Sequence, residues 1–151
     1  MIEEKLKKVF DIRPNGLELS TCEMGFGRLE NLESMQLGFR DDGEGNQIDD
    51  WFGDGYYIVG FDSMLGDPLI VNIDEKGIPV YFMMHDDWDS LTKIANSIED
   101  FAEILKLIEQ TNLKYDKEVK KLLKRINKLA PKKCYYWESL IETENEALNE
   151  E

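Results

Sequence analysis

Three short apolar runs occupy the middle of the chain, at residues 56–61, 69–73 and 80–84. Short runs of this kind, rich in aromatic and β-branched residues, are typical of β-strands. The links between them are short, and the link at 74–77 ends in a glycine, which suits a hairpin turn. The pattern therefore predicts three strands joined as an antiparallel meander.

The hydrophobic period changes to that of a helix on either side of this meander. Apolar residues at 2, 6, 9 and 10 predict a short amphipathic helix over residues 2–10. A second helix is predicted after the meander, and Ser97 followed by Asp100 resembles the capping box at a helix start. Its apolar stripe consists of Ile94, Ile98, Phe101, Leu105 and Ile108.

The remaining segments give weaker patterns. Two further helices are predicted in the C-terminal third, from about 116 to 130 and from 135 to 148, with Pro131 between them. Residues 17–22 alternate apolar and polar and predict a strand, whereas the glycines of 25–27 predict a turn or bulge.

These elements together predict an α+β fold, with a mainly antiparallel sheet flanked by helices and extra helices at the C-terminus. Residues 29–39 fit neither period, and the polar, glycine-rich residues 41–46 predict an exposed loop. The chain has no internal repeat and no long linker. We therefore expect a single domain over residues 1–151 that includes a helical extension at about 112–151.

Hydropathy and cysteine content indicate a compartment. No apolar run approaches the ~18 residues of a membrane helix, and the N-terminus lacks the apolar segment of a secretory signal. The two cysteines, Cys22 and Cys134, are far apart and match no metal-binding spacing. We expect them to be free thiols in a cytoplasmic protein.

Charge is distributed unevenly along the chain, whose net charge is −14. Residues 41–100 hold 15 Asp and Glu against two Lys and Arg, a net of −13, whereas residues 112–133 hold nine Lys and Arg against two acids, a net of +7. The acidic region repels the phosphates of nucleic acid and attracts a basic protein surface. The alternative interpretation is that the acidity only keeps the protein soluble.

Candidate metal and phosphate sites are sparse. The chain has one His and no CxxC or HExxH spacing. The acidic loop departs from the calcium-binding pattern, because Gln47 and Gly53 stand where that pattern requires Gly and Glu. Glycine-rich phosphate loops are missing as well. We therefore expect no metal and no cofactor.

The single histidine begins the run His85-Asp86-Asp87, which is a candidate acid–base unit. Because no nucleophile motif accompanies it, the favoured interpretation is that His85 closes a strand end and Trp88 packs nearby. An enzyme built on His85 and Asp67 is the alternative. It requires these two side chains to meet in a closed pocket.

Aromatic and acidic residues lie side by side just before the meander, where Asp49, Asp50 and Asp54 surround Trp51. This combination recurs at protein–protein hot spots, since a partner buries the ring while the acid meets Arg or Lys. The alternative is that Trp51 and Phe52 lead into a strand and pack in the core. Both interpretations are compatible, because alternate strand residues face opposite ways.

An ordered set of features runs from Tyr57 to Phe101. It consists of a strand ending near Gly60, the turn Gly66-Asp67-Pro68, the strand 69–74, Pro79-Val80-Tyr81, His85, Trp88 and a helix entry at 94–101. In its order and spacing, this stretch of roughly a third of the chain resembles the SUKH superfamily. Bacterial members of that family are mostly immunity proteins of toxin systems, and it also includes fungal regulators of cell-wall synthesis. The first 40 residues depart from the family pattern.

The resemblance implies an α+β domain that binds a partner protein and catalyses no reaction. Asp67, His85 and Trp88 stand at matching positions, together with Gly66, and are assigned to a binding surface. Combined with the acidic region, the resemblance implies an immunity protein that neutralises a toxin.

The favoured target is a nuclease-type toxin, because a cleft that binds nucleic acid is basic. The expected contacts on this chain are Asp49, Asp50, Trp51 and Asp54. The alternative function is a regulatory scaffold or adaptor without a toxin partner. The oligomeric state stays open between monomer and homodimer.

Overall fold

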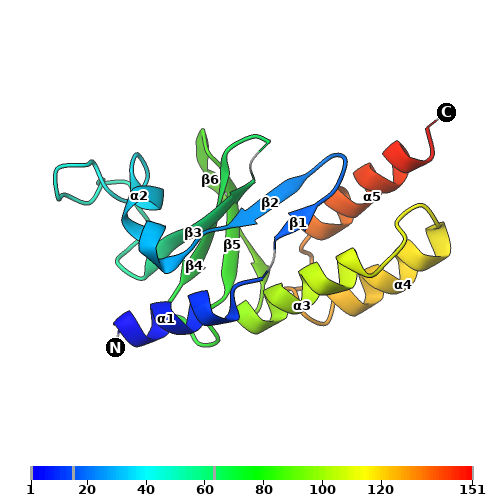
Figure 1. The fold of residues 1–151 in the computed structure, drawn as a ribbon, viewed down its shortest axis with the longest axis horizontal. Helices are drawn as coiled ribbons and strands as arrows, with labels where there is room; N and C mark the ends of the chain where they lie inside the picture. Colours follow the sequence, from blue (N-terminus) through cyan, green and yellow to red (C-terminus); the bar gives the residue numbers. More distant parts are fainter. Residues whose placement is uncertain (1, 15, 63, 151) are drawn as a thin grey trace.

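The computed structural model describes residues 2–14, 16–62 and 64–150, which form an antiparallel sheet with helices around it (Figure 1). Each strand pairs with the next in the chain, so the order in the sheet is the order in the sequence. The predicted α+β class is confirmed. The six strands are β1 (Leu17–Glu18), β2 (Glu23–Phe26), β3 (Tyr56–Asp62), β4 (Asp67–Asn72), β5 (Val80–Met84) and β6 (Asp87–Ala95).

Five α-helices accompany the sheet, and none in the described part of the chain has the length and apolar character needed to cross a membrane. Figure 1 shows the four longer helices gathered along one side of the sheet and the short α2 at the other. The helices are α1 (Ile2–Ile12), α2 (Leu32–Gln36), α3 (Ile98–Glu109), α4 (Asp116–Ile126) and α5 (Tyr136–Leu148), with a 3-10 turn, η1, at Leu29–Asn31.

The predicted meander corresponds to β3, β4 and β5, but it continues into a strand that the sequence did not predict. Residues Asp87–Ala95 form β6, and Ile94 lies in this strand, not on the helix where we expected it. Helix α3 begins at Ile98. The predicted cap is confirmed, because the Ser97 hydroxyl accepts the backbone N–H of Asp100 at 3.0 Å.

The strand predicted over residues 17–22 is confirmed only at Leu17–Glu18, because the rest of that segment is the turn of the β1–β2 hairpin. The chain turns at Ser20 and Thr21, and the Leu19 N–H donates to the Cys22 carbonyl at 2.8 Å. This turn holds neither glycine nor asparagine, so it lacks the residues that usually mark a hairpin. The turn predicted at 25–27 was also wrong at Gly25, which lies in β2 opposite Phe61.

A chain of four rings joins three helices to one face of the sheet. Phe10 of α1 packs on Phe26 of β2, with ring centroids 6.0 Å apart, and Phe26 packs on Phe101 of α3 at 6.4 Å. Phe101 in turn packs on Trp137 of α5 at 6.0 Å. The Trp137 indole N–H donates to the Ile94 carbonyl at 2.6 Å, which ties α5 to β6. Helix α4 lies outside this layer, against α3 and α5.

One side chain takes the place of a neighbouring strand at the edge of β3, beyond the point where the pairing with β2 ends. Strand β2 pairs with β3 only at Gly60 and beyond, which leaves Ile58 without a strand partner on that edge. Gln36, at the end of α2, takes this place: its amide N–H donates to the Ile58 carbonyl at 2.8 Å, and its side-chain oxygen accepts the Ile58 N–H at 2.9 Å. Gln36 is 2% exposed, so water does not compete for these bonds.

We expect Gln36→Ala to destabilise the protein strongly, because it leaves the buried N–H and carbonyl of Ile58 unpaired. At about 1–3 kcal/mol for each buried unsatisfied group, the free energy of unfolding should fall by roughly 2–4 kcal/mol. Urea unfolding followed by circular dichroism measures it. The control Gln47→Ala, in the exposed loop, should change the value by less than about 0.5 kcal/mol. A Gln36→Ala variant as stable as this control would contradict the role given to Gln36.

Candidate partner-binding face

The two faces of the sheet are covered differently. Alternate residues of a strand point to opposite faces. In β5, Phe82 packs against Tyr136 of α5, with ring centroids 4.6 Å apart. Its neighbour Tyr81 therefore faces away from the helices, where it packs on Tyr56 of β3 at 5.6 Å.

Tyr56 and Tyr81 belong to a continuous group of seven rings on that second face. Neighbouring rings have centroids 5.1–6.3 Å apart, the range of favourable aromatic pairs. Strands β3, β5 and β6 contribute rings, and the loop between α2 and β3 lays its own rings over them. We call this group the aromatic face: Phe39, Trp51, Phe52, Tyr56, Phe61, Tyr81 and Trp88.

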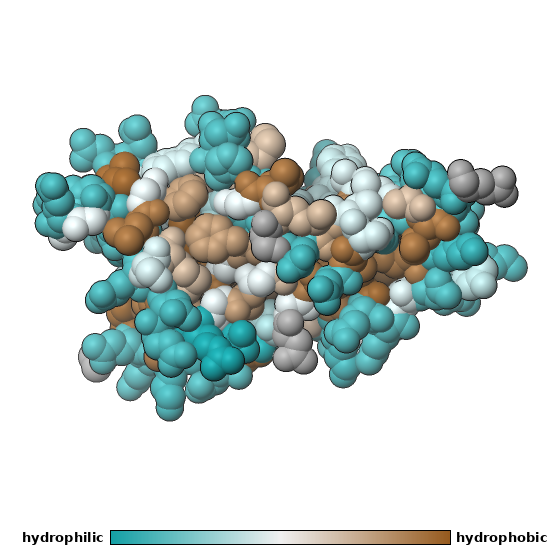
Figure 2. Space-filling model, turned by 45° about the horizontal axis from the view of Figure 1, so that its top comes forward, coloured by the Kyte–Doolittle hydropathy of each residue, from teal (hydrophilic) through white to brown (hydrophobic). Residues whose placement is uncertain are grey.

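Most of the aromatic face is only half-buried. Trp51 is 5% exposed, and the other six rings are of intermediate exposure. Figure 2 shows apolar surface left of centre, with hydrophilic side chains around it. The chain thus offers ordered rings to solvent on a face that no long helix covers, as a protein-binding surface does.

Exposed carboxylates border these rings. Asp49, Asp50 and Asp54 are exposed and lie within a few residues of Trp51 and Phe52 in the same loop. Asp74 is exposed as well, and its carboxylate lies against the backbone of Gly55, just before β3. We call these four aspartates the acidic rim.

Two of the nearby cations, Arg40 and Lys93, form contacts within the molecule. The Arg40 guanidinium lies 4.1 Å from the ring centroid of Tyr57, and its Nη2 donates to the Asp54 carbonyl at 3.0 Å and to the Tyr57 hydroxyl at 3.2 Å. Lys93 of β6 forms an ion pair with Glu75. Glu75 thus offsets the charge of Lys93, whereas Arg40 meets neutral groups and keeps its charge, so the four aspartates still outnumber the nearby unpaired cations.

The structure places the predicted contact residues in two separate groups. Trp51 and Trp88 meet edge to face in the aromatic face, with centroids 5.6 Å apart. Trp51 also donates its indole N–H to the Tyr56 carbonyl at 2.9 Å, so it organises the cluster more than it meets solvent. Asp49, Asp50 and Asp54 are exposed beside it.

Asp67 and His85 form the second group, at the turns on one end of the sheet. Buried Asp67 accepts two hydrogen bonds from His85, one from the backbone N–H at 2.9 Å and one from Nδ1 at 2.8 Å. The contact fastens the start of β4 to the turn between β5 and β6. It gives Asp67 a local structural role whether or not a partner binds here.

The contact between His85 and Asp67 meets one condition of the enzyme alternative, since the two side chains do touch. The His85 side chain is, however, 49% exposed at a turn, and within the described residues its ring has no hydrogen-bond partner other than Asp67.

Burial raises the pKa of the Cys22 thiol to about 12, which disfavours a nucleophilic thiolate. No three His, Cys, Asp or Glu side chains in the described ranges are grouped to hold a metal ion.

Sequence reasoning missed most of the ring contacts. Phe39 stacks on Trp88 at 6.3 Å although 49 positions separate them, and no local pattern connects the two.

Comparison with family models, with curated proteins and with solved structures finds no match to this chain. The SUKH resemblance therefore rests on residues 57–101 alone and stays a prediction.

The protonation of His85 gives a test of the turn geometry. The hydrogen bond to Asp67 raises the pKa of His85 above its ordinary value of 6.5, burial opposes this, and the charges of Asp86 and Asp67 add to it. Because folding raises this pKa, protonated His85 stabilises the folded state. This contribution is fully present below pH 6.5 and is lost as the pH rises through the raised pKa.

We expect an NMR titration of this single histidine to give a pKa above 6.5, and Asp67→Asn to lower it. Asp86→Asn is the matched control, which removes a nearby charge without removing the hydrogen bond and should lower the pKa less. An unshifted value in the wild-type protein, or equal values in the wild type and Asp67→Asn, would contradict the geometry.

Proposed function

We propose that this chain is a non-catalytic binding protein whose aromatic face and acidic rim hold a basic partner protein. The observation that supports this most directly is the coincidence of half-buried, already ordered rings with exposed carboxylates around them. Rings fixed by their neighbours lose little conformational freedom on binding, so they make efficient anchors. The carboxylates steer a cationic surface toward them.

The chemistry of the partner follows from charge. Residues 41–100 carry a net charge of −13, which disfavours nucleic acid and any acidic protein. Of the two cations in this region, Lys93 is paired with Glu75 and Lys76 is exposed, so the region keeps a large excess of negative charge. A surface rich in Lys and Arg is the complement that remains.

In its more specific form, our proposal is toxin neutralisation in the cytoplasm. The resemblance to the SUKH superfamily supports an immunity role, and a toxin that cleaves nucleic acid has a basic cleft. An acidic rim that enters such a cleft competes with the phosphates of the substrate. The proposal assigns the inhibitory contact to Asp49, Asp50 and Asp54, with Trp88 and Phe52 as the apolar anchors.

The test uses the purified proteins encoded by the two genes that flank this one, with calorimetry at 50 mM and 200 mM NaCl. We expect one of them to be basic and to bind. The double variant Asp49→Lys with Asp54→Lys should weaken this binding at least about 100-fold at the lower salt, because each charge reversal turns an attraction into a repulsion. The control Glu138→Lys with Glu142→Lys changes net charge equally on exposed positions of α5 and should alter binding less than about threefold.

A second variant tests the rings. Removing a hot-spot ring costs about 2 kcal/mol or more, so Trp88→Ala should weaken binding about 30-fold, with circular dichroism confirming that the variant is folded. Unchanged affinity in both the Trp88 variant and the charge-reversed variant would overturn the proposed face. Tight binding of a partner that is neither basic nor a toxin would support the scaffold alternative instead.

A further inference from the structure

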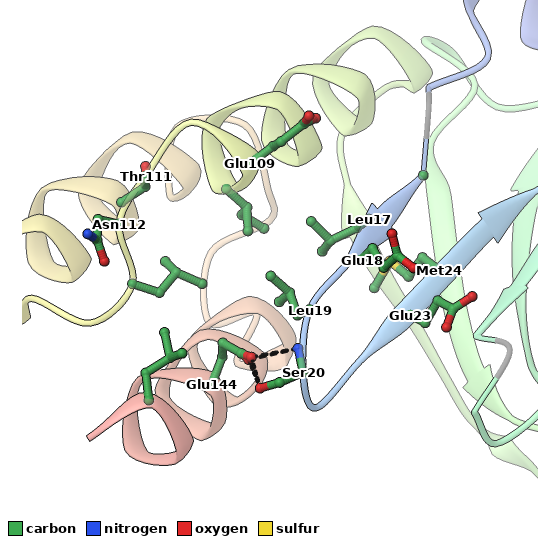
Figure 3. Close-up of a pocket in the computed structure, with 14 residues that line it drawn as sticks. Leu17, Glu18, Leu19, Ser20, Glu23, Met24, Glu109, Thr111, Asn112 and Glu144 are labelled. Carbon is green, nitrogen blue, oxygen red and sulfur yellow. Dashed lines mark hydrogen bonds between the residues drawn. The ribbon is translucent and has the colours of Figure 1, made fainter. Parts of the chain in front are cut away.

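A groove of about 720 Å³ lies beside β1, at the opposite edge of the sheet from Trp88 (Figure 3). It is bounded by the β1–β2 hairpin on one side and by the end of α3, the following loop and α5 on the other. Its apolar floor includes Leu17, Met24, Ile108 and Leu113, each at most 5% exposed. This size is within the range of ligand sites, about 300–1,000 Å³.

All the formal charge in this groove is negative. Four glutamates line it, and its fourteen lining residues include no Lys, Arg or His. Glu18 and Glu109 are exposed, and neither forms an ion pair within the described part of the chain. The groove therefore combines apolar walls with the exposed carboxylates of Glu18 and Glu109, which complement the charge of a cationic ligand.

Glu144 adds a buried carboxylate to this wall. It is 2% exposed, and Figure 3 shows it reaching from α5 to the tip of the hairpin. Its oxygens accept the Ser20 backbone N–H at 2.8 Å and 3.2 Å and also the Ser20 hydroxyl. These donors are neutral, and no Lys, Arg or His forms an ion pair with Glu144 among the described residues. The Thr21 hydroxyl also donates to Glu144 at 3.5 Å, so the carboxylate is well hydrogen-bonded and adds to the wall a negative charge that these neutral donors do not offset.

We propose that this groove is a second binding site, which takes an Arg- or Lys-bearing segment of a partner protein. Arginine and lysine have apolar stems that lie along apolar surface while the charged head stays at its border. The floor receives the stem and neighbouring apolar side chains, and Glu18, Glu109 and Glu144 draw the head. A volume of about 720 Å³ has room for several side chains, so it fits a short segment better than a single ion.

This site goes beyond the proposed function and does not depend on it. The groove borders β1, whereas the aromatic face draws its last ring from β6, and these are the two outer strands of the sheet. Variants of the acidic rim therefore leave the groove intact. Failure of one proposal leaves the other standing.

The test is a titration of the isotope-labelled protein, followed by NMR at 50 mM NaCl. The probe is a five-residue peptide with blocked ends that alternates leucine with two arginines. A matched peptide carries citrulline, which has nearly the shape of arginine without its charge. We expect the arginine peptide to shift the amide signals of groove residues such as Glu18, Ser20 and Thr111, and the citrulline peptide to bind at least about tenfold more weakly.

Charge-neutral variants locate the site. Glu18→Gln with Glu109→Gln should weaken binding of the arginine peptide about three- to tenfold, as expected for two solvent-accessible ion pairs. Glu138→Gln with Glu142→Gln changes net charge equally at exposed positions of α5 and should leave binding unchanged. The acidic-rim variant Asp49→Lys with Asp54→Lys should still show the same shifts at groove residues.

Three results would overturn the inference. The first is equal binding of the arginine and citrulline peptides. The second is a set of shifted signals that lies on the aromatic face and not in the groove. The third is tighter binding of free agmatine than of the peptide, with the same groove signals shifted, which would assign the site to a small amine in place of a protein segment.

Discussion

The structure depends on one constraint: an antiparallel sheet of six strands has two faces, and the long helices of this chain cover only one. On that face, the rings of Phe101 and Trp137 join α3 and α5, and Trp137 is also hydrogen-bonded to β6. The second face receives the loop between α2 and β3 instead. Its rings pack on one another but leave six of the seven half-buried.

That incomplete cover links the fold to the proposed function. A half-solvated aromatic surface is an aggregation risk unless charge surrounds it, and the acidic rim supplies charge of one sign. Lys93 is paired with Glu75, and Arg40 is positioned by Tyr57 and the Asp54 carbonyl, so the rim keeps a net negative charge. In the proposed function, the same charge makes the face selective for a basic partner.

Local patterns predicted much of the fold, since α1, the three central strands, the Ser97 cap and the C-terminal helices each follow from spacing within a short window. Strand β6 was not predicted because it is an outer strand in which exposed and partly buried residues alternate, and its two buried residues, Ile94 and Ala95, come at its end. The amide bridge from Gln36 to Ile58 and the stacking of Phe39 on Trp88 join distant positions, so no local pattern predicts them. Of the candidate site, the sequence indicated three of the four rim aspartates and both tryptophans, but neither Asp74 nor the contacts among the rings.

The central claim is that the aromatic face and its acidic rim are the surface that a basic partner covers. Amide hydrogen exchange of this chain, free and bound to the basic product of a flanking gene, tests it most directly. Our account predicts slower exchange on binding at residues 49–57 and 87–93, with little change in α3 and α4. Protection confined to the helices, with residues 49–57 exchanging as fast as in the free protein, would contradict it.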